Sequence, residues 1–134
     1  MPTSGDAIPD PKARTLTRGS KRYRRKVASP KQWAKIAAEK LGPCRICGEQ
    51  GNNGRLHGKI HLHHIVPRGA PWFGEDVPEN IAPLCPFDHD LVTRRDKGAC
   101  VVFVMCLADD EYAYAVERGG EAFWERAYGV EYRR

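Results

Sequence analysis

The sequence predicts a single α+β domain behind a basic N-terminal arm, on three observations. Its 134 residues can form one domain with a modest core but not two sizeable ones. Residues 56–66 alternate as a half-buried strand does, and helix-like patterns stand on both sides of them. The excess positive charge lies entirely before residue 43. We therefore expect an arm at residues 1–28 and a folded domain at residues 29–134.

The arm carries the charge asymmetry of the chain. Residues 1–42 hold 11 Lys and Arg against 3 Asp and Glu, net +8, and residues 43–134 hold 11 against 14, net −3. Three prolines and few apolar residues in residues 1–28 predict disorder. Such an arm suits contact with the phosphates of a nucleic acid, and it equally suits a solvated segment that keeps the protein soluble.

The composition argues against membrane and secreted classes of protein. No apolar run approaches the length of a membrane span, and the first residues lack the apolar core of an export signal. We therefore expect a cytoplasmic protein with no membrane partner. Because thiols stay reduced there and the five cysteines are an odd number, the C-x-x-C at Cys44 and Cys47 indicates metal ligation rather than a disulfide.

The first element is a helix that begins at Pro30 with a capping box formed by Ser29 and Gln32. The Gly-Pro pair at residues 42–43 ends it. Four residues form an apolar face that we expect to pack in the core beside the first cysteine pair: Trp33, Ile36, Ala37 and Leu41.

A hairpin turn at Asn53–Gly54 is expected to lead into the strand of residues 56–66. His63 and His64 lie at the end of this strand. Since successive side chains of a strand point to opposite faces, these two histidines can serve one site only if the strand twists or bends there.

Residues 67–80, with three prolines and two glycines, predict a long ordered loop. Trp72 and Phe73 at its tip are expected to plug the loop onto the core in preference to touching a base or sugar. Residues 81–84 are a short return strand, and residues 87–96 a short helix with acids near its start.

The C-terminal third is expected to contain a strand and two helices. The valine-rich run of residues 100–107 predicts a buried strand in which Cys100 and Cys106 pack. Helices are expected over residues 109–120 and 121–130. Their core residues would be Tyr112, Tyr114, Val116, Phe123, Trp124 and Tyr128.

Two short motifs have the spacing of a structural metal site. Cys44 and Cys47 can hold one Zn²⁺ from a tight turn, and Cys85 and Asp88 repeat the same gap. Aspartate is unusual beside three thiolates. Three histidines therefore stay open as alternative fourth ligands: His57, His61 and His89. Asp88 is favoured over them because it repeats the spacing of the first pair.

The remaining histidines suggest a second, catalytic metal. His63 from the strand end and His89 from the following helix can meet and leave open positions for water and phosphate oxygens. His64, neutral near physiological pH, can then take a proton from an attacking water. The amide of Asn80 can pin the loop or orient the His64 ring.

The blocks HHIVPRG and ENIAPLC, with a histidine after Cys85, resemble the HNH endonuclease family and its ββα-metal, or His-Me finger, fold. The frame SPKQWAKIAAEKLGPCRICG before them and EYAYAVERGGEAFWERAYGV after them is similar to small HNH proteins of phages and prophages in Gram-positive bacteria. The resemblance implies a ββα-metal core with structural zinc knuckles and flanking helices.

The resemblance also implies roles for individual residues. His64 matches the general base, Asn80 the central Asn, and His63 and His89 the metal ligands. Asp88 departs from the pattern, because it replaces the second cysteine of the usual second knuckle. Thr93 stands where some relatives have a further ligand, one helical turn after the last histidine.

The resulting hypothesis is an endonuclease that nicks or cuts double-stranded DNA with Mg²⁺, Mn²⁺ or another divalent ion. Seven basic residues are expected to contact phosphates: Arg22, Arg24, Arg25, Lys26, Arg68, Arg94 and Arg95. One alternative is a non-catalytic zinc-stapled DNA-binding module. Another is a packaging accessory protein with an inactive motif, since phage proteins of this type resemble partners of the terminase and act in the bacterial host cytoplasm.

Overall fold

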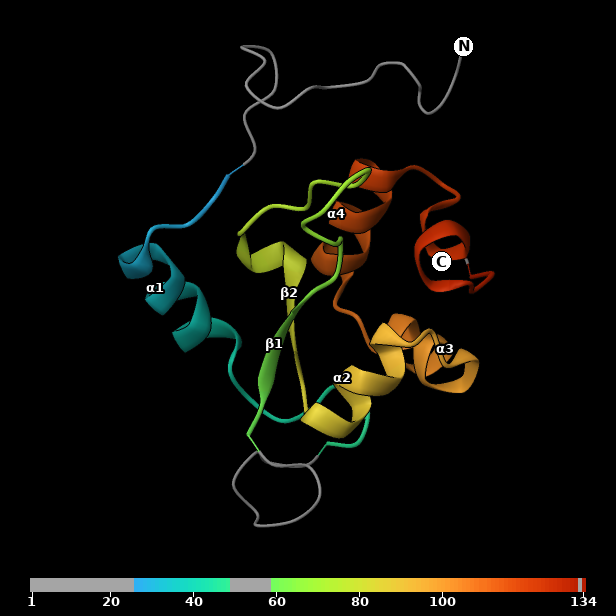
Figure 1. Cartoon of the computed structure of the whole chain (residues 1–134), viewed down its shortest axis with the longest axis horizontal. Coiled ribbons are helices and arrows are strands. Elements are labelled where there is room, and N and C mark those ends of the chain that lie inside the picture. Colours follow the sequence, from blue (N-terminus) through green and yellow to red (C-terminus); the bar gives the residue numbers. More distant parts are fainter. Residues whose placement is uncertain (1–25, 49–58, 133) are drawn as a thin grey trace.

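The computed structural model describes residues 26–48, 59–132 and 134. Its centre is an antiparallel pair of strands, β1 (His61–His64) and β2 (Ile81–Leu84), in which His61 lies opposite Leu84 and His64 opposite Ile81. Helix α2 (Pro86–Thr93) follows β2 directly (Figure 1). The return strand predicted over residues 81–84 is confirmed, and the helix predicted over residues 87–96 is present but ends at Thr93. The expected turn at Asn53–Gly54 lies outside the described residues.

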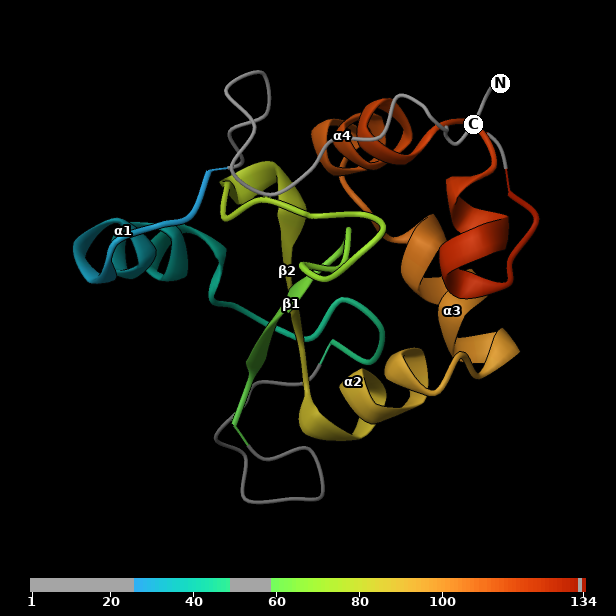
Figure 2. The ribbon, with the colours of Figure 1, turned by 45° about the horizontal axis from the view of Figure 1, so that its top comes forward.

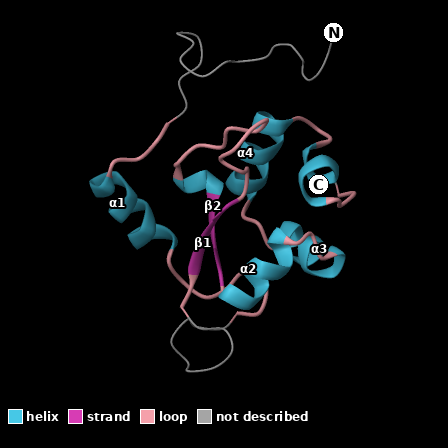
Figure 3. Cartoon of the chain, in the orientation of Figure 1, coloured by secondary structure: helices cyan, strands magenta, loops and turns pink. Residues whose placement is uncertain are grey.

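Helices surround this hairpin. α1 (Pro30–Lys40) lies on one side of it, and α2, α3 (Lys97–Met105) and the C-terminal segment lie on the other, as two views show (Figures 1 and 2). α4 (Asp109–Gly119) passes beside the loop that joins the strands. Within the described part of the chain the hairpin is the whole sheet (Figure 3), so the α+β prediction is confirmed.

The capping box of α1 is present as predicted, because Ser29 Oγ accepts from Gln32 N–H and Gln32 Oε1 accepts from Ser29 N–H. The packing of its apolar face was predicted less well. Ile36 is buried, but Leu41 is exposed at the C-cap. Trp33 is half-buried, and its ring stacks on the His64 ring with 5.7 Å between centroids.

The buried strand predicted over residues 100–107 is wrong, because this run forms α3. Asp96 caps the helix by accepting from Ala99 N–H at 3.0 Å. Burial then follows helical spacing and overrides the β-propensity of valine: Phe103 and Val104 are fully buried, whereas Val102 faces solvent. Of the two cysteines expected in the core, Cys100 is buried and Cys106 is exposed.

The C-terminal segment is more irregular than predicted. α4 begins at the predicted residue, but residues 121–130 form a short π-helical turn at Trp124–Tyr128 instead of a regular helix. Phe123, Trp124 and Tyr128 are buried as expected. Trp72 packs edge-on against Phe123, with ring centroids 5.0 Å apart, which confirms that this tryptophan plugs the loop onto the core.

A buried carboxylate connects three parts of the fold. Glu111 of α4 has no exposed surface and accepts hydrogen bonds from Arg45, Lys40 and the Ala108 N–H. Burial acts to raise the pKa of Glu111, but the hydrogen bonds from the two cations outweigh it and hold the pKa below its usual value. Glu111 therefore fixes the end of α1 and the first cysteine pair against α4.

We expect Glu111→Gln to lower the free energy of unfolding by about 3–5 kcal/mol, because it leaves two cations beside a buried neutral amide. The wild type should also lose stability as the pH falls below 4.5, since a carboxylate with a lowered pKa stabilises the fold only while it is ionised. Glu117→Gln, an exposed acid on the same helix, is the control. Equal denaturant midpoints for the two variants would contradict this role.

Candidate functional site

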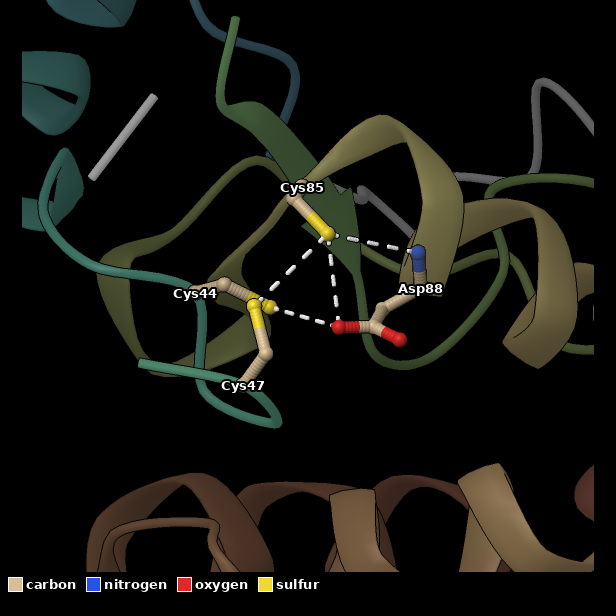
Figure 4. Close-up of side chains that lie close together, drawn as sticks. All are labelled: Cys44, Cys47, Cys85 and Asp88. Atoms are coloured by element: carbon tan, nitrogen blue, oxygen red, sulfur yellow. Dashed lines mark hydrogen bonds between the residues drawn. The ribbon is translucent and has the colours of Figure 1, made fainter. Parts of the chain in front are cut away.

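The four residues predicted to form the structural metal site do come together. Cys44 and Cys47 lie in the turn after α1, Cys85 joins β2 to α2, and Asp88 lies in the first turn of α2 (Figure 4). Their candidate ligand atoms all lie within 4.8 Å of one another. The cluster thus holds the end of the hairpin and the start of α2 against the turn that follows α1.

The spacing within this cluster fits a tetrahedral ion. Asp88 Oδ2 lies 3.2 Å from Cys44 Sγ and 3.3 Å from Cys85 Sγ, and the sulfur atoms of Cys47 and Cys85 are 3.9 Å apart. Zinc with bonds of about 2.3 Å to sulfur and about 2.0 Å to oxygen spaces its ligands about 3.8 Å (S to S) and about 3.5 Å (S to O) apart. The donors present could therefore hold a zinc ion.

Protonation of the cluster depends on whether a cation is bound. Burial raises the pKa of the Cys85 thiol, and the charges of Cys44 and Asp88 raise it further. A divalent cation reverses this preference, since it binds thiolates and displaces their protons. Metal affinity should therefore fall as the pH is lowered.

The positions of Asp88 and of two of the alternative histidines show which of them lies beside the three cysteines. Among the described residues, the metal-competent cluster contains Asp88 and neither His61 nor His89. Those two histidines contact each other instead, with their Nδ1 atoms 2.9 Å apart. The third alternative, His57, lies outside the described residues.

The adjacent histidines at the end of β1 contact different parts of the molecule. The His63 ring lies 5.0 Å from the His89 ring and 5.3 Å from the Phe103 ring. His64 instead contacts Asp76 and Trp33. In the pairing with β2, His63 lies opposite Ala82 and His64 opposite Ile81, so the two side chains leave the strand in different directions. The charge of His64 still lowers the pKa of His63, so the two imidazoles lie close to each other.

His63 and His89 are both suited to bind a cation as neutral imidazoles. Burial, together with the neighbouring His89 and His64, lowers the pKa of His63 to about 3. Burial also lowers the pKa of His89, together with the adjacent His61. Each ring is therefore neutral near pH 7 and keeps one unprotonated nitrogen available as a ligand.

A tyrosine determines which nitrogen of His63 is available. The Tyr128 hydroxyl donates its one proton to the carbonyl oxygen of Ile65. The contact of 2.9 Å between His63 Nε2 and the same hydroxyl must then be donated by the histidine. The proton of His63 is thus on Nε2, and the lone pair on Nδ1.

Asn80 pins the loop in place. Its amide is completely buried, accepts from Val66 N–H at 2.7 Å, and donates to the carbonyl oxygens of Val66 at 3.1 Å and Glu75 at 2.9 Å. These bonds close the loop of residues 67–80 onto the end of β1. Two roles were expected for Asn80: holding the loop in place or orienting the His64 ring. These hydrogen bonds match the first role.

Asp76 orients the His64 ring, and sequence reasoning missed it. Its Oδ1 lies 2.7 Å from His64 Nε2, and its Oδ2 accepts from Ala28 N–H at 2.9 Å. Burial acts to raise the pKa of Asp76, but the Ala28 N–H, His64 and Arg68 outweigh it and keep the pKa low. No motif marks an acid in a loop, so only the fold reveals this contact.

Two basic residues expected to contact phosphates lie near this pair. Arg68 Nε is 3.8 Å from Asp76 Oδ1, and its side chain is half exposed. The Lys26 backbone donates to Glu75 and accepts from Asp76 N–H, so the last residues of the predicted arm lie against the loop.

The other basic residues lie elsewhere. Arg94 pairs with the exposed Asp90 on α2, and Arg95 donates to the Arg126 carbonyl oxygen at 3.4 Å. The positions of three further arginines lie outside the described residues: Arg22, Arg24 and Arg25.

Comparison with known proteins finds one family match. Residues 44–95, which contain both cysteine motifs and all four candidate catalytic residues, match the model of the HNH endonuclease family. No curated protein and no solved structure matches the chain. Among the described residues, no helix is both long and apolar enough to span a membrane.

Substitution of Asp88 tests the metal cluster. Asp88→Cys supplies a fourth thiolate and should hold zinc more tightly, whereas Asp88→Ala should weaken zinc binding by at least about tenfold in competition with a chelator. Asp90→Ala, an exposed acid on the same helix, should leave zinc content unchanged. A wild-type protein that purifies without zinc and does not bind it would contradict the assignment.

Proposed function

We propose that this protein is a metal-dependent endonuclease that hydrolyses phosphodiester bonds of DNA with a water activated by His64. The observation that carries the proposal is the partly buried contact between His64 Nε2 and Asp76 within a segment that matches the HNH endonuclease family. A histidine held by a carboxylate is the arrangement in which imidazole acts as a general base.

The hydrogen bond to Asp76 determines which atom of His64 accepts the proton. A carboxylate with a low pKa accepts hydrogen bonds only, so His64 Nε2 carries the proton and Nδ1 has the lone pair. Nδ1 can then take a proton from water as its oxygen attacks phosphorus. The stacked Trp33 ring restricts rotation of the imidazole and keeps Nδ1 in a fixed direction.

The site for the catalytic ion is proposed at His63 and His89. A divalent ion such as Mg²⁺ or Mn²⁺ would stabilise the charge that develops on the phosphate and on the leaving oxygen. Both imidazoles have lowered pKa values, so they can serve as ligands without first losing a proton at neutral pH. The thiolate and carboxylate cluster would hold a structural Zn²⁺ that positions α2, and with it His89.

The charged surface beside His64 suits a DNA backbone. Arg68 and the chain at Lys26 lie next to Asp76, and Lys26 ends a strongly basic stretch of the sequence, residues 21–26. Phosphate contacts there would place the backbone next to the proposed base without reading sequence. The arm would thus deliver DNA to the site from the Asp76 side of the hairpin.

A second candidate is a zinc-stapled DNA-binding protein without catalysis, such as an accessory protein that acts beside a phage terminase. The contacts of His63 with Tyr128 and Phe103 favour it, since they are what a purely structural histidine would make. This candidate predicts DNA binding without cleavage in any metal.

Cleavage of supercoiled plasmid separates the two candidates. With Mg²⁺ or Mn²⁺ the wild type should produce relaxed or linear DNA, and His64→Ala should reduce the rate by at least about a hundredfold, as expected for loss of a general base. Asp76→Asn should give an intermediate loss. Glu117→Gln, exposed on α4, should cut normally.

Two outcomes would contradict the proposal. Full activity of His64→Ala would exclude this residue as the base. Binding of plasmid by the wild type without cleavage, in every divalent ion tried, would favour the accessory protein.

A further inference from the structure

His61 is a histidine for which the proposed mechanism has no role. It is exposed at the start of β1, and its Nδ1 lies 2.9 Å from Nδ1 of His89. The two rings meet edge to face, with centroids 5.1 Å apart. The nitrogen of this exposed imidazole faces a nitrogen of a proposed metal ligand. This geometry indicates a role for His61 beyond that of a solvated surface residue.

The distance between the two nitrogens matches two neighbouring ligands of one ion. With metal–nitrogen bonds of about 2.0–2.1 Å, two imidazole nitrogens at the right angle of an octahedral or square-planar ion such as Ni²⁺ lie about 2.9 Å apart. Two neutral imidazoles can also share one hydrogen bond at this distance. The ion and the shared proton are thus competing explanations of the same contact, and they can be separated by experiment.

The strand places further imidazole close to the pair. His61 and His63 are two residues apart on β1 and therefore face the same side, where α2 presents His89. His63 approaches His89 ring to ring, although its nitrogens do not join the other two in a single cluster of ligand atoms in the described structure. Thr93, one helical turn after His89, offers a hydroxyl and no imidazole nitrogen.

We propose that His61 binds, together with His89, the divalent ion of the candidate catalytic site. This inference rests on the proposed function only for the role of the ion, because binding itself can be measured without DNA. Imidazole donors suit Ni²⁺, Zn²⁺ and similar transition-metal ions, whereas Mg²⁺ prefers oxygen ligands and water. The site should therefore bind Ni²⁺ much more tightly than Mg²⁺.

Calorimetric titration of the zinc-loaded protein with Ni²⁺ tests the proposal. The wild type should bind one Ni²⁺, and His61→Ala should bind it at least about tenfold more weakly, since even the loss of an outer partner of a ligand has that effect. His89→Ala should lose the site. Lys59→Ala, an exposed residue two positions before His61, should bind as the wild type does.

His61→Asn distinguishes the ion from a shared proton. Asparagine can still hydrogen-bond to His89 but is a poor ligand for Ni²⁺, so the proposal expects weak binding, as in His61→Ala. Wild-type affinity in either variant would overturn the proposal, as would a wild type that binds no Ni²⁺ beyond its zinc.

These outcomes are independent of the plasmid assay. If His61→Ala binds Ni²⁺ normally while His64→Ala fails to cut, the inference about His61 fails and the proposed endonuclease stands. If His61→Ala loses Ni²⁺ and no metal supports cleavage, the metal site stands and the proposed function fails.

Discussion

The alternation of side chains along β1 is the constraint on which the candidate site depends. His63 and His64 are adjacent, so the regular pairing with β2 sends one imidazole toward α2 and the other toward the loop. Each side then has its own partners: His89 approaches His63, and Asp76 holds His64. Adjacent residues of one strand thus supply the proposed metal ligand and the proposed base.

This arrangement requires both sides of the hairpin to be held firmly. On the loop side, Asn80 closes the loop onto β1, and α4 holds it through two contacts: the Tyr114 hydroxyl with Glu75, and Arg118 with the Phe73 carbonyl oxygen. On the other side, the cysteine and aspartate cluster fixes the start of α2. Glu111 joins the two supports, because it binds Arg45, next to the first cysteine, from α4.

Sequence patterns predicted local features well and long-range partners poorly. The capping box at Ser29 and the spacing of Cys44 and Cys47 depend on residues close together in the chain, so they could be recognised. The contact between His64 and Asp76 depends on the path of a loop, and that between His63 and Tyr128 on a distant C-terminal turn. The valine-rich run of α3 has the local propensity of a strand, but packing with distant residues decides its burial and makes it a helix.

The adjacency of Asp88 and His89 ties the two proposed metal sites together. Asp88 belongs to the thiolate cluster, and the ring of the next residue, His89, contacts the rings of His61 and His63 on β1. Asp88 also lies in the first turn of α2, where a carboxylate interacts favourably with the helix dipole, and its N–H contacts Cys85 Sγ at 3.4 Å. An aspartate in place of a cysteine would thus supply a negative ligand while it stabilises the helix start. Because one short turn of α2 carries both residues, loosening of the cluster would displace His89 before it affected His64.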